Sequence, residues 1–248
     1  MKISVITASY NSAATIADTL RSVAEQDHHD IEHIIIDGAS RDNTMQIVED
    51  FNHVAIKFSE KDKGIYDAMN KGVQKASGDI IAILNSDDFY SSSNVLSEVA
   101  RLFEDPSVQA VYGDLQYVDQ NDTSKIKRYW KAGKFAHQKF LYGWMPPHPS
   151  FFVRKEVYDQ VGLFNTDLRT SADYELMLRI LMKHRLQAAY LPMVLVKMRE
   201  GGLSNSSFKH RLKANREDRL AWKLNGLRPY FFTLYLKPIR KIFQFILK

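Results

Sequence analysis

Residues 78–88 read GDIIAILNSDD. The apolar run from Ile80 to Leu84 shows no alternation of polar and apolar side chains, and it leads into two adjacent aspartates, Asp87 and Asp88. Such a run, bounded by glycine and by polar residues, is typical of a strand buried on both faces, as in a parallel sheet covered by helices. The stretch therefore predicts a central strand with two like charges beyond its carboxyl end.

Strand and helix patterns alternate over the residues that precede this stretch. Strands are expected at 2–9, 31–38, 54–59 and 78–84, and helices at 14–26, 40–51 and 64–77. A chain that alternates in this way folds as a sheet between two layers of helices. The pattern therefore predicts an α/β fold with a mostly parallel central sheet flanked by helices.

Three polar segments follow three of these strands: TASYN at 7–11, DGASRDNT at 37–44 and NSDD at 85–88. In open α/β sheets, ligands bind in the crevice outside the carboxyl ends of the strands. We therefore expect these three loops to converge on one binding site.

The type of ligand follows from what these loops contain. Neither the glycine-rich loop of dinucleotide-binding proteins nor the phosphate-binding loop of P-loop NTPases occurs, so both classes are disfavoured. The loops instead carry Asp37, Asp87 and Asp88. Carboxylate oxygens suit Mg²⁺ or Mn²⁺, which often bind one or two carboxylates together with substrate phosphates.

Two adjacent aspartates repel each other unless a cation or hydrogen bonds compensate them. An alternative is that they cap the helix expected after SSSNVLSEV at 91–99, because aspartate is a good N-cap residue. Ser91 to Asn94 lie nearer to that helix and offer capping side chains of their own. We therefore favour a site for a metal ion and phosphate.

Composition limits the remaining possibilities. The 248 residues include no cysteine, which excludes disulfides and thiolate metal sites and favours a cytoplasmic location. The first residues have the pattern of a core strand and not that of a signal peptide. No apolar run approaches the roughly 18 to 20 residues of a membrane-spanning helix. We expect a cytoplasmic protein that is at most peripheral on the inner face of the cell membrane.

Positive charge is concentrated at the end of the chain. Residues 206–248 hold 11 of the 34 Lys and Arg residues and two acids, Glu217 and Asp218. After Pro238, apolar residues recur at helical spacing between cations, at Ile239, Ile242, Phe243 and Ile246. Such a helix suits an anionic membrane surface, and the alternative is a terminal helix packed on the core. No nucleic-acid-binding motif accompanies the basic run, so we expect no nucleic acid partner.

The order and spacing of TASYNSAATIADTLRSV, IIIDGASRDNT and DKGIYDAMNKGVQKASGDIIAILNSDD resemble the nucleotide-sugar-binding half of family 2 glycosyltransferases with the GT-A fold. The similarity covers residues 2–89 and resumes at 148–180. It is greatest to bacterial enzymes that build exopolysaccharide or lipopolysaccharide repeat units. The resemblance implies a catalytic domain at 1–205, with a nucleotide-sugar-binding half at 1–90 and an acceptor half at 91–205. A basic amphipathic helical extension at 206–248 would follow.

The resemblance also implies roles for individual residues. Asp37 would bind the uracil ring, Asp87 would face the ribose or sugar, and Asp88 would bind Mn²⁺ or Mg²⁺ on the diphosphate. Asn85 stands where many members have the first aspartate of the motif. The nucleobase and ribose would be held around the end of the first strand, and the donor cleft would be lined by the helix at 64–77. The residues implied there are Thr7, Ala8, Ser9 and Asn11 for the strand, and Asp67 or Asn70 for the helix.

In the family, an acid near the start of the helix expected at 171–184 removes the proton from the acceptor hydroxyl, and here that residue is Asp173. Glu175 is the competing candidate. The alternative for Asp173 is a capping box with Thr170, which needs no catalysis. His148 is a weaker candidate for facing the acceptor or the metal, and Ser204 for a loop over the diphosphate.

The resemblance implies an inverting transfer of a sugar, from a UDP-sugar in particular, to a hydroxyl of a glycan or of a polyprenyl-diphosphate-linked glycan. Two alternatives stay open. One is a sugar-phosphate nucleotidylyltransferase, which usually opens with a glycine-rich loop that TASYNSA lacks. The other is a non-catalytic module that binds a nucleotide sugar or a membrane.

Overall fold

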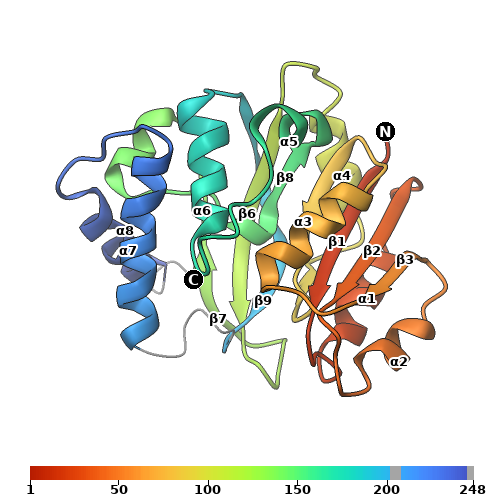
Figure 1. Ribbon diagram of the computed structural model, residues 1–248. Coiled ribbons are helices and arrows are strands. Elements are labelled where there is room, and N and C mark those ends of the chain that lie inside the picture. Colours follow the sequence, from red (N-terminus) through yellow and green to blue (C-terminus); the bar gives the residue numbers. More distant parts are fainter. Residues whose placement is uncertain (202–207, 245–248) are drawn as a thin grey trace.

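A computed structural model describes residues 1–201 and 208–244. For residues 208–213 and 241–243 it describes the backbone only. One mixed sheet runs through the molecule in the order β3-β2-β1-β4-β8-β6-β9-β5, with β7 paired to β6 (Figure 1). The strands are β1 (Ile3–Ser9), β2 (Ile31–Asp37), β3 (Val54–Ser59), β4 (Ile80–Ile83), β5 (Asp88–Tyr90), β6 (Ala110–Val118), β7 (Ile126–Trp130), β8 (Phe151–Arg154) and β9 (Ala188–Arg199).

Helices lie on both faces of this sheet. They are α1 (Ile16–Ala24), α2 (Thr44–Glu49), α3 (Ile65–Lys75), α4 (Val95–Leu102), α5 (Lys155–Val161), α6 (Ala172–Met177), α7 (Phe208–Leu224) and α8 (Thr233–Phe243). Two short 3₁₀ segments, η1 (His137–Tyr142) and η2 (His148–Ser150), precede β8, and α6 continues as a π-helical segment, η3 (Leu178–Lys183).

The first four strands are parallel to one another, as predicted. The second half of the chain adds β8 antiparallel to β4 and β6 antiparallel to β8, and then β9 parallel to β6. The alternation of strand and helix patterns ends after β4, so the sequence predicted the parallel half and not the mixed half. The whole is an α/β sheet flanked by helices.

The strands alternate their apolar side chains between two separate parts of the core. Ile6 of β1 packs with Met69 and Val73 of α3, whereas Ile3 of the same strand packs with Val95 and other residues of α4. Strands with both faces buried have this continuous apolar pattern. Because β1, β2 and β4 are parallel, their carboxyl ends lie at the same edge of the sheet.

The C-terminal helices pack on the second half of the sheet domain. The indole of Trp222 is buried and donates a hydrogen bond to the Tyr174 hydroxyl of α6 at 2.9 Å, and Thr233 donates to the Leu141 carbonyl at 2.6 Å. The expected helix after Pro238 in fact begins at Thr233, so this proline lies inside α8. Among the described helices, none combines the length and the apolar character needed to cross a bilayer.

Candidate active site

The loop that carries the two aspartates is fixed by hydroxyl groups of α1 and the residues just before it. Thr19 donates to the Asp88 carbonyl at 2.7 Å, and Thr15 donates to the Ser86 carbonyl at 2.9 Å. The Ser12 and Ser86 hydroxyls are 2.7 Å apart. Because these bonds hold the backbone of 86–88, the acidic side chains are positioned before any ligand arrives.

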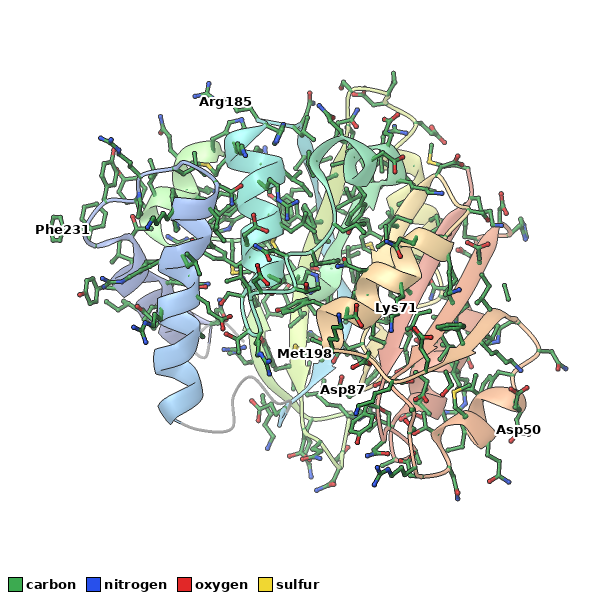
Figure 2. All side chains as sticks on the ribbon, viewed as in Figure 1. Asp50, Lys71, Asp87, Arg185, Met198 and Phe231 are labelled. Atoms are coloured by element: carbon green, nitrogen blue, oxygen red, sulfur yellow. The ribbon has the colours of Figure 1, made fainter. Side chains whose placement is uncertain are left out.

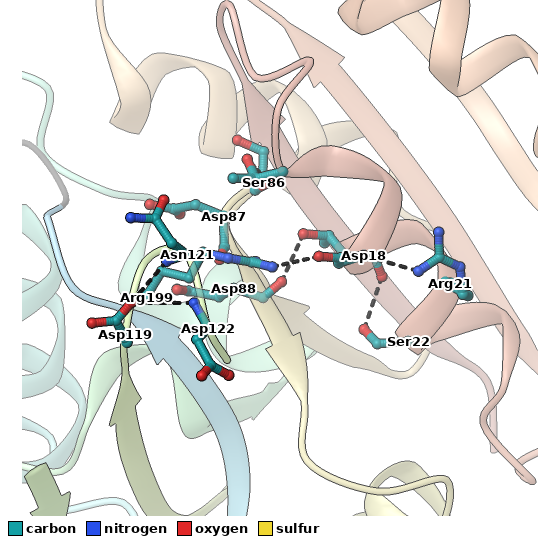
Figure 3. Close-up of polar contacts among 12 residues, drawn as sticks. Asp18, Arg21, Ser22, Ser86, Asp87, Asp88, Asp119, Asn121, Asp122 and Arg199 are labelled. Atoms are coloured by element: carbon teal, nitrogen blue, oxygen red, sulfur yellow. Dashed lines mark hydrogen bonds and ion pairs between the residues drawn. The ribbon is translucent and has the colours of Figure 1, made fainter. Parts of the chain in front are cut away.

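Arg199, the last residue of β9, supplies a positive charge to the acidic pair. Its guanidinium donates to the Asp87 carbonyl at 2.9 Å, forms an ion pair with Asp18 of α1, and lies 5.0 Å from the centre of the Phe89 ring. In Figure 3 its side chain passes beside the pair and reaches Asp18. Arg199 was not predicted from the sequence. The only local signal for it is that a basic residue stands at the end of a strand.

Burial dominates the electrostatics of the pair. It raises the pKa of Asp87, and it raises the pKa of Asp88 well above the usual range, with the Asp87 charge as the second cause. Arg199 acts in the opposite direction on both. The buried Asp88 therefore resists ionisation unless a further positive charge is close.

The donor set around Asp88 fits a hard divalent cation. One carboxylate oxygen accepts a hydrogen bond from the Asn85 amide at 3.0 Å, whereas Asp88 Oδ1 and Asn85 Oδ1 are buried without a hydrogen-bond partner among the described residues. Unpaired buried oxygens are costly and point to a missing ligand. No cluster of three or more His, Asp or Glu side chains surrounds them in the described part of the chain. A cation here would therefore draw further ligands from substrate.

The capping alternative for the pair is wrong. Asp88 begins β5, which pairs with β9, and α4 starts only at Val95 with Asn94 as its N-cap residue. Neither aspartate is near the free N–H groups of that helix.

Asp37 is buried at the end of β2, where it ties three strands together. Its carboxylate accepts hydrogen bonds from the Ser9 hydroxyl at 3.1 Å, the Ser59 hydroxyl at 2.7 Å, and the backbone N–H and hydroxyl of Ser40. A carboxylate has about four acceptor positions, and all of them are used here. Asp37 organises the loop after β2, and a direct bond to a nucleobase would require one of these hydroxyls to turn away.

The residues at the end of β1 separate into buried and exposed ones. Thr7, Ala8 and Ser9 are buried, and the Thr7 hydroxyl is 3.1 Å from His33 Nε2. Asn11 is exposed with a positive φ of 49°, and its side-chain oxygen accepts from the Arg41 N–H at 2.9 Å. Asn11 therefore joins the loops after β1 and β2, and of these four residues it is the one open to a ligand.

On α3, Asp67 and Asn70 are both engaged by protein groups. Asp67 forms an ion pair with Lys71 at 3.2 Å and accepts from the Lys63 N–H at 3.0 Å. Asn70 donates to the Phe164 carbonyl and accepts from the Phe164 N–H, both at 2.9 Å. Asn70 thus fastens the segment before α6 to α3.

Asp173 lies in the first turn of α6 and contacts the hydroxyl of Tyr66. Its Oδ1 accepts a hydrogen bond from the Tyr66 hydroxyl at 3.0 Å, and the Tyr66 ring stacks on Phe164 with ring centres 5.7 Å apart. The His148 ring meets Phe164 edge-on at 5.8 Å. Burial lowers the pKa of His148, and the Asp173 charge opposes that shift. Tyr66 was missed in the sequence.

Both alternatives to Asp173 are excluded by the contacts of its neighbours. Thr170 donates its hydroxyl and its N–H to Glu217 of α7, both at 2.7 Å, so the capping box does not form. Glu175 is buried in an ion pair with Arg179 at 2.6 Å and accepts from the Asn225 amide at 3.0 Å. Asp173 keeps one oxygen without a protein donor in these contacts. Ser204 lies outside the described residues.

The sequence of the chain is similar to those of known proteins. The family described as Glycosyl transferase family 2 matches residues 4–162. A PGL/p-HBAD biosynthesis glycosyltransferase of Mycobacterium bovis is 31% identical over 210 residues, which cover 82% of this chain and 79% of the relative. An uncharacterized glycosyltransferase of Mycobacterium tuberculosis is 33% identical over 180 residues, which cover 71% of this chain and 68% of the relative.

Solved structures resemble the fold. TarS 1-349 of S. aureus in complex with UDP-GlcNAc has a TM-score of 0.67 at 18% identity, over 91% of this chain and 65% of that chain. A mannosyltransferase of Pyrobaculum calidifontis in complex with GDP-Man and Mn²⁺ has a TM-score of 0.68 at 21% identity, over 95% of this chain and 68% of that chain. The chain therefore belongs to glycosyl transferase family 2 and is a glycosyltransferase with the GT-A fold.

Proposed function

We propose that the protein transfers a sugar, with inversion, from a UDP-sugar to a hydroxyl of a glycan or of a polyprenyl-diphosphate-linked glycan in bacterial surface polysaccharide synthesis, of the exopolysaccharide or lipopolysaccharide type. One observation carries the proposal: the chain builds two distinct acidic centres, Asp88 with an unpaired buried oxygen and Asp173 with one oxygen held by Tyr66. A single displacement needs one group for the leaving diphosphate and another for the attacking hydroxyl.

The donor's diphosphate belongs at the acidic pair. Asp88, with Asp87 as its neighbour, would hold Mn²⁺ or Mg²⁺, which when bound neutralises the negative charge of the departing nucleoside diphosphate. Arg199 and the hydroxyls of α1 keep the backbone of the pair in place. Arg199 offsets part of the charge of the two carboxylates. It therefore lowers the free-energy cost of holding them side by side before the donor binds.

The nucleoside belongs at the ends of β1 and β2. Asn11 is exposed there and offers amide groups to a base or ribose, while Ser9 and Asp37 form the floor beneath it. Thr7 and Ala8 lie in the same buried floor. On α3, Asp67 and Asn70 would shape the donor cleft by fixing neighbouring segments, through Lys63 and Phe164 respectively.

The acceptor belongs beside Asp173. Tyr66 holds Oδ1 of this carboxylate, so Oδ2 is the atom that would take the proton from the acceptor hydroxyl. General-base help of this kind typically contributes about 10²- to 10⁴-fold. The rings of Tyr66, Phe164 and His148 give the acceptor an apolar wall, and sugars commonly stack on such rings.

The place of the reaction follows from the acceptor. A polyprenyl-diphosphate-linked glycan is found at the cytoplasmic leaflet, so the protein would work in the cytoplasm, peripherally at the inner face of the membrane. In this proposal residues 1–205 form the catalytic unit, with the donor half at 1–90 and the acceptor half at 91–205, and residues 206–248 form the basic extension.

The proposal is tested by donor binding and turnover in one set of variants. A thermal-shift screen of UDP-sugars and GDP-mannose with Mn²⁺ identifies the donor, because a ligand at about 100 times its Kd adds about 2.7 kcal/mol to the free energy of unfolding. We expect a UDP-sugar to raise the melting temperature of the wild type. Asp88→Asn loses the Mn²⁺-dependent part of that shift. Asp173→Asn keeps the shift and loses about 10²- to 10⁴-fold in kcat.

Asp50→Asn is the matched control, because it removes an exposed carboxylate at the end of α2, away from both centres (Figure 2). It is expected to behave as the wild type. A full Mn²⁺-dependent shift in Asp88→Asn contradicts the cation site, and full turnover in Asp173→Asn contradicts the base. The anomeric configuration of the product, read by NMR, tests inversion separately.

A further inference from the structure

Large apolar side chains are exposed on one part of the molecule. Phe231 is 89% exposed, and Tyr235 and Ile239 follow it at four-residue spacing with 58% and 47% exposure. Four residues is about one helical turn, so Tyr235 and Ile239 share a face of α8, and Phe231 continues their row at the start of that helix. Figure 2 shows Phe231 at the edge of the molecule, pointing away from it.

This row is not a scattered set of surface residues. Of the eleven described large hydrophobic residues that are exposed, seven lie on η1, α7 and α8 or on the turn between these two helices. They are Tyr142, Leu220, Leu224, Tyr230, Phe231, Tyr235 and Ile239. Single exposed apolar residues are normal, whereas a gathered set marks an interaction surface.

Cations stand beside the row. Arg219, Lys223 and Arg228 line an open groove of about 580 Å³ together with Trp222 and Leu227. Arg219 also lies over the Tyr235 ring, 6.0 Å from its centre. The groove and the apolar row are therefore parts of one surface, which we call the α7–α8 face: Phe231, Tyr235 and Ile239 with Arg219, Lys223 and Arg228.

The acids of the same segment do not reach this face. Asp218 is buried and bonded to Lys237 at 2.7 Å, and Glu217 accepts hydrogen bonds from Thr170. Among the described residues of α7, α8 and their connection, the exposed charges are all positive. A partner must therefore offer negative charge at its surface and an apolar layer just beneath it.

We propose that the α7–α8 face docks on an anionic phospholipid bilayer, with lipid phosphates in the groove and the aromatic row in the interfacial layer. Aromatic residues with a polar tip favour that layer, and an amphipathic helix with cations beside its apolar face binds anionic lipid. The inference builds on the proposed lipid-linked acceptor, but the surface does not depend on which sugar is transferred.

A second copy of the chain fits this face less well. In a two-fold dimer the same patch meets itself, so Arg219, Lys223 and Arg228 of one copy would approach the same cations of the other. Like charges brought together across an interface cost free energy. The bilayer supplies the opposite charge instead.

The test measures sedimentation of the purified full-length protein with vesicles. We expect binding to vesicles of phosphatidylcholine mixed with phosphatidylglycerol, and little to phosphatidylcholine alone. Arg219→Gln, Lys223→Gln and Arg228→Gln combined are expected to weaken binding roughly 100-fold, at about a factor of five for each cation near the surface. Phe231→Ser is expected to weaken it about tenfold through lost apolar transfer. Both variants keep hydrolysis of a soluble nucleotide sugar.

The matched control removes the same charge elsewhere, with Arg101→Gln, Lys125→Gln and Arg185→Gln combined, and it is expected to bind as the wild type. Equal losses in both triple variants, no loss in either, or no binding to anionic vesicles would overturn the proposal. So would a dimer in analytical ultracentrifugation that Phe231→Ser abolishes. If the protein binds vesicles but does not hydrolyse the donor, the result would contradict the proposed function and still support the docking surface.

Discussion

Tyr66 and Asp173 are 107 residues apart in the sequence, and one hydrogen bond of 3.0 Å joins them. The bond fixes the position of Oδ1 of the carboxylate. Burial and the Asp173 charge together raise the pKa of Tyr66 well above its usual value, so the phenol stays a donor at all working pH values. Tyr66 is therefore a positioning residue for the proposed base.

Tyr66→Phe tests this role. We expect kcat to fall about tenfold, which corresponds to a hydrogen bond of about 1.4 kcal/mol, with KM for the donor unchanged. The melting temperature is expected to stay at the wild-type value, which separates lost positioning from a structural defect. Steady-state kinetics of the variant with donor and acceptor, together with its melting temperature, are the measurement.

The control for Tyr66→Phe is Tyr90→Phe, which also deletes one hydroxyl. The Tyr90 hydroxyl is buried and has no hydrogen-bond partner among the described residues, so its loss is expected to leave kcat unchanged. A wild-type kcat in Tyr66→Phe, with Asp173→Asn inactive, would remove the positioning role and keep the base.

How far single residues could be predicted depends on where their partners lie. Asp88 and Asp173 were predicted because each stands in a local motif that resembles the family, and their roles stay proposals. Arg199 and Tyr66 were missed because their roles come from contacts with Asp87 and Asp173, far away in the sequence. Asp37 was placed at the correct strand end, but the number of hydroxyls bonded to it could not be read from the order of residues.

Helix α3 approaches β1 so closely at Gly72 that a larger residue does not fit there without a shift. A Cβ atom at Gly72 would lie 2.2 Å from Cγ2 of Ile6, which is fully buried. This contact sets the distance between the helix and the sheet. Because α3 also carries Tyr66 and Asn70, the same contact helps to position the proposed acceptor wall.

Gly72→Ala is expected to destabilise the protein. Alanine would gain about 1 kcal/mol over glycine in a helix, but overpacking a buried position costs roughly 1–3 kcal/mol, and a gap of 2.2 Å puts this site at the upper end of that range. The net expectation is a loss of about 1–2 kcal/mol in the free energy of unfolding. Urea denaturation measures it.

Gln74→Ala is the matched substitution on the exposed face of the same helix, and it is expected to change the free energy of unfolding by less than about 0.5 kcal/mol. A more stable Gly72→Ala variant would show that helical propensity outweighs the contact with Ile6. In that case α3 does not depend on close packing at this point.

Element types were more predictable than their boundaries and their pairing. The parallel strands β1 to β4 follow from short apolar runs between helical patterns, and these were confirmed. A helix was expected after Pro238 from the helical spacing of the apolar residues there, yet α8 begins at Thr233. Packing of Leu234 and Thr233 against the core outweighs the tendency of proline to disfavour a helix interior. It is a tertiary contact that the local sequence does not contain.

In the whole molecule, the proposed donor site and the C-terminal helices lie far apart. The parallel half ends in the loops of the proposed donor site, and α7 and α8 lie on the opposite side of the molecule, beyond α6 (Figure 1). The sequence predicted a basic extension from its charge, since the basic residues gather after residue 205. It left the choice between membrane and core open, and the structure shows that the described part of the tail packs on the core with one face and exposes the other.

A buried histidine links the stability of the whole fold to pH. His33 Nε2 is 3.1 Å from the Thr7 hydroxyl, and His33 Nδ1 is 3.1 Å from His53 Nε2. Burial, followed by the His53 charge, lowers the pKa of His33 from 6.5 to about 3. Burial and then Lys57 also lower the pKa of His53. The raised pKa values of Asp87 and Asp88 act with the opposite sign at low pH, so the pH curve of the wild type alone does not isolate the histidine.

The comparison of wild type with His33→Gln isolates it. Because the folded pKa of His33 is depressed, the unfolded chain binds more protons between pH 6.5 and about 3. The histidine's contribution is therefore complete above pH 6.5 and is lost as pH falls, at up to about 1.4 kcal/mol per pH unit. We expect His33→Gln to be less stable than the wild type at pH 7, and the difference to shrink steadily toward pH 4. Gln74→Ala, which removes an exposed side chain that does not titrate, should keep a constant difference. A pH-independent gap for His33→Gln, measured by urea denaturation at each pH, would mean that His33 does not remain neutral in the fold.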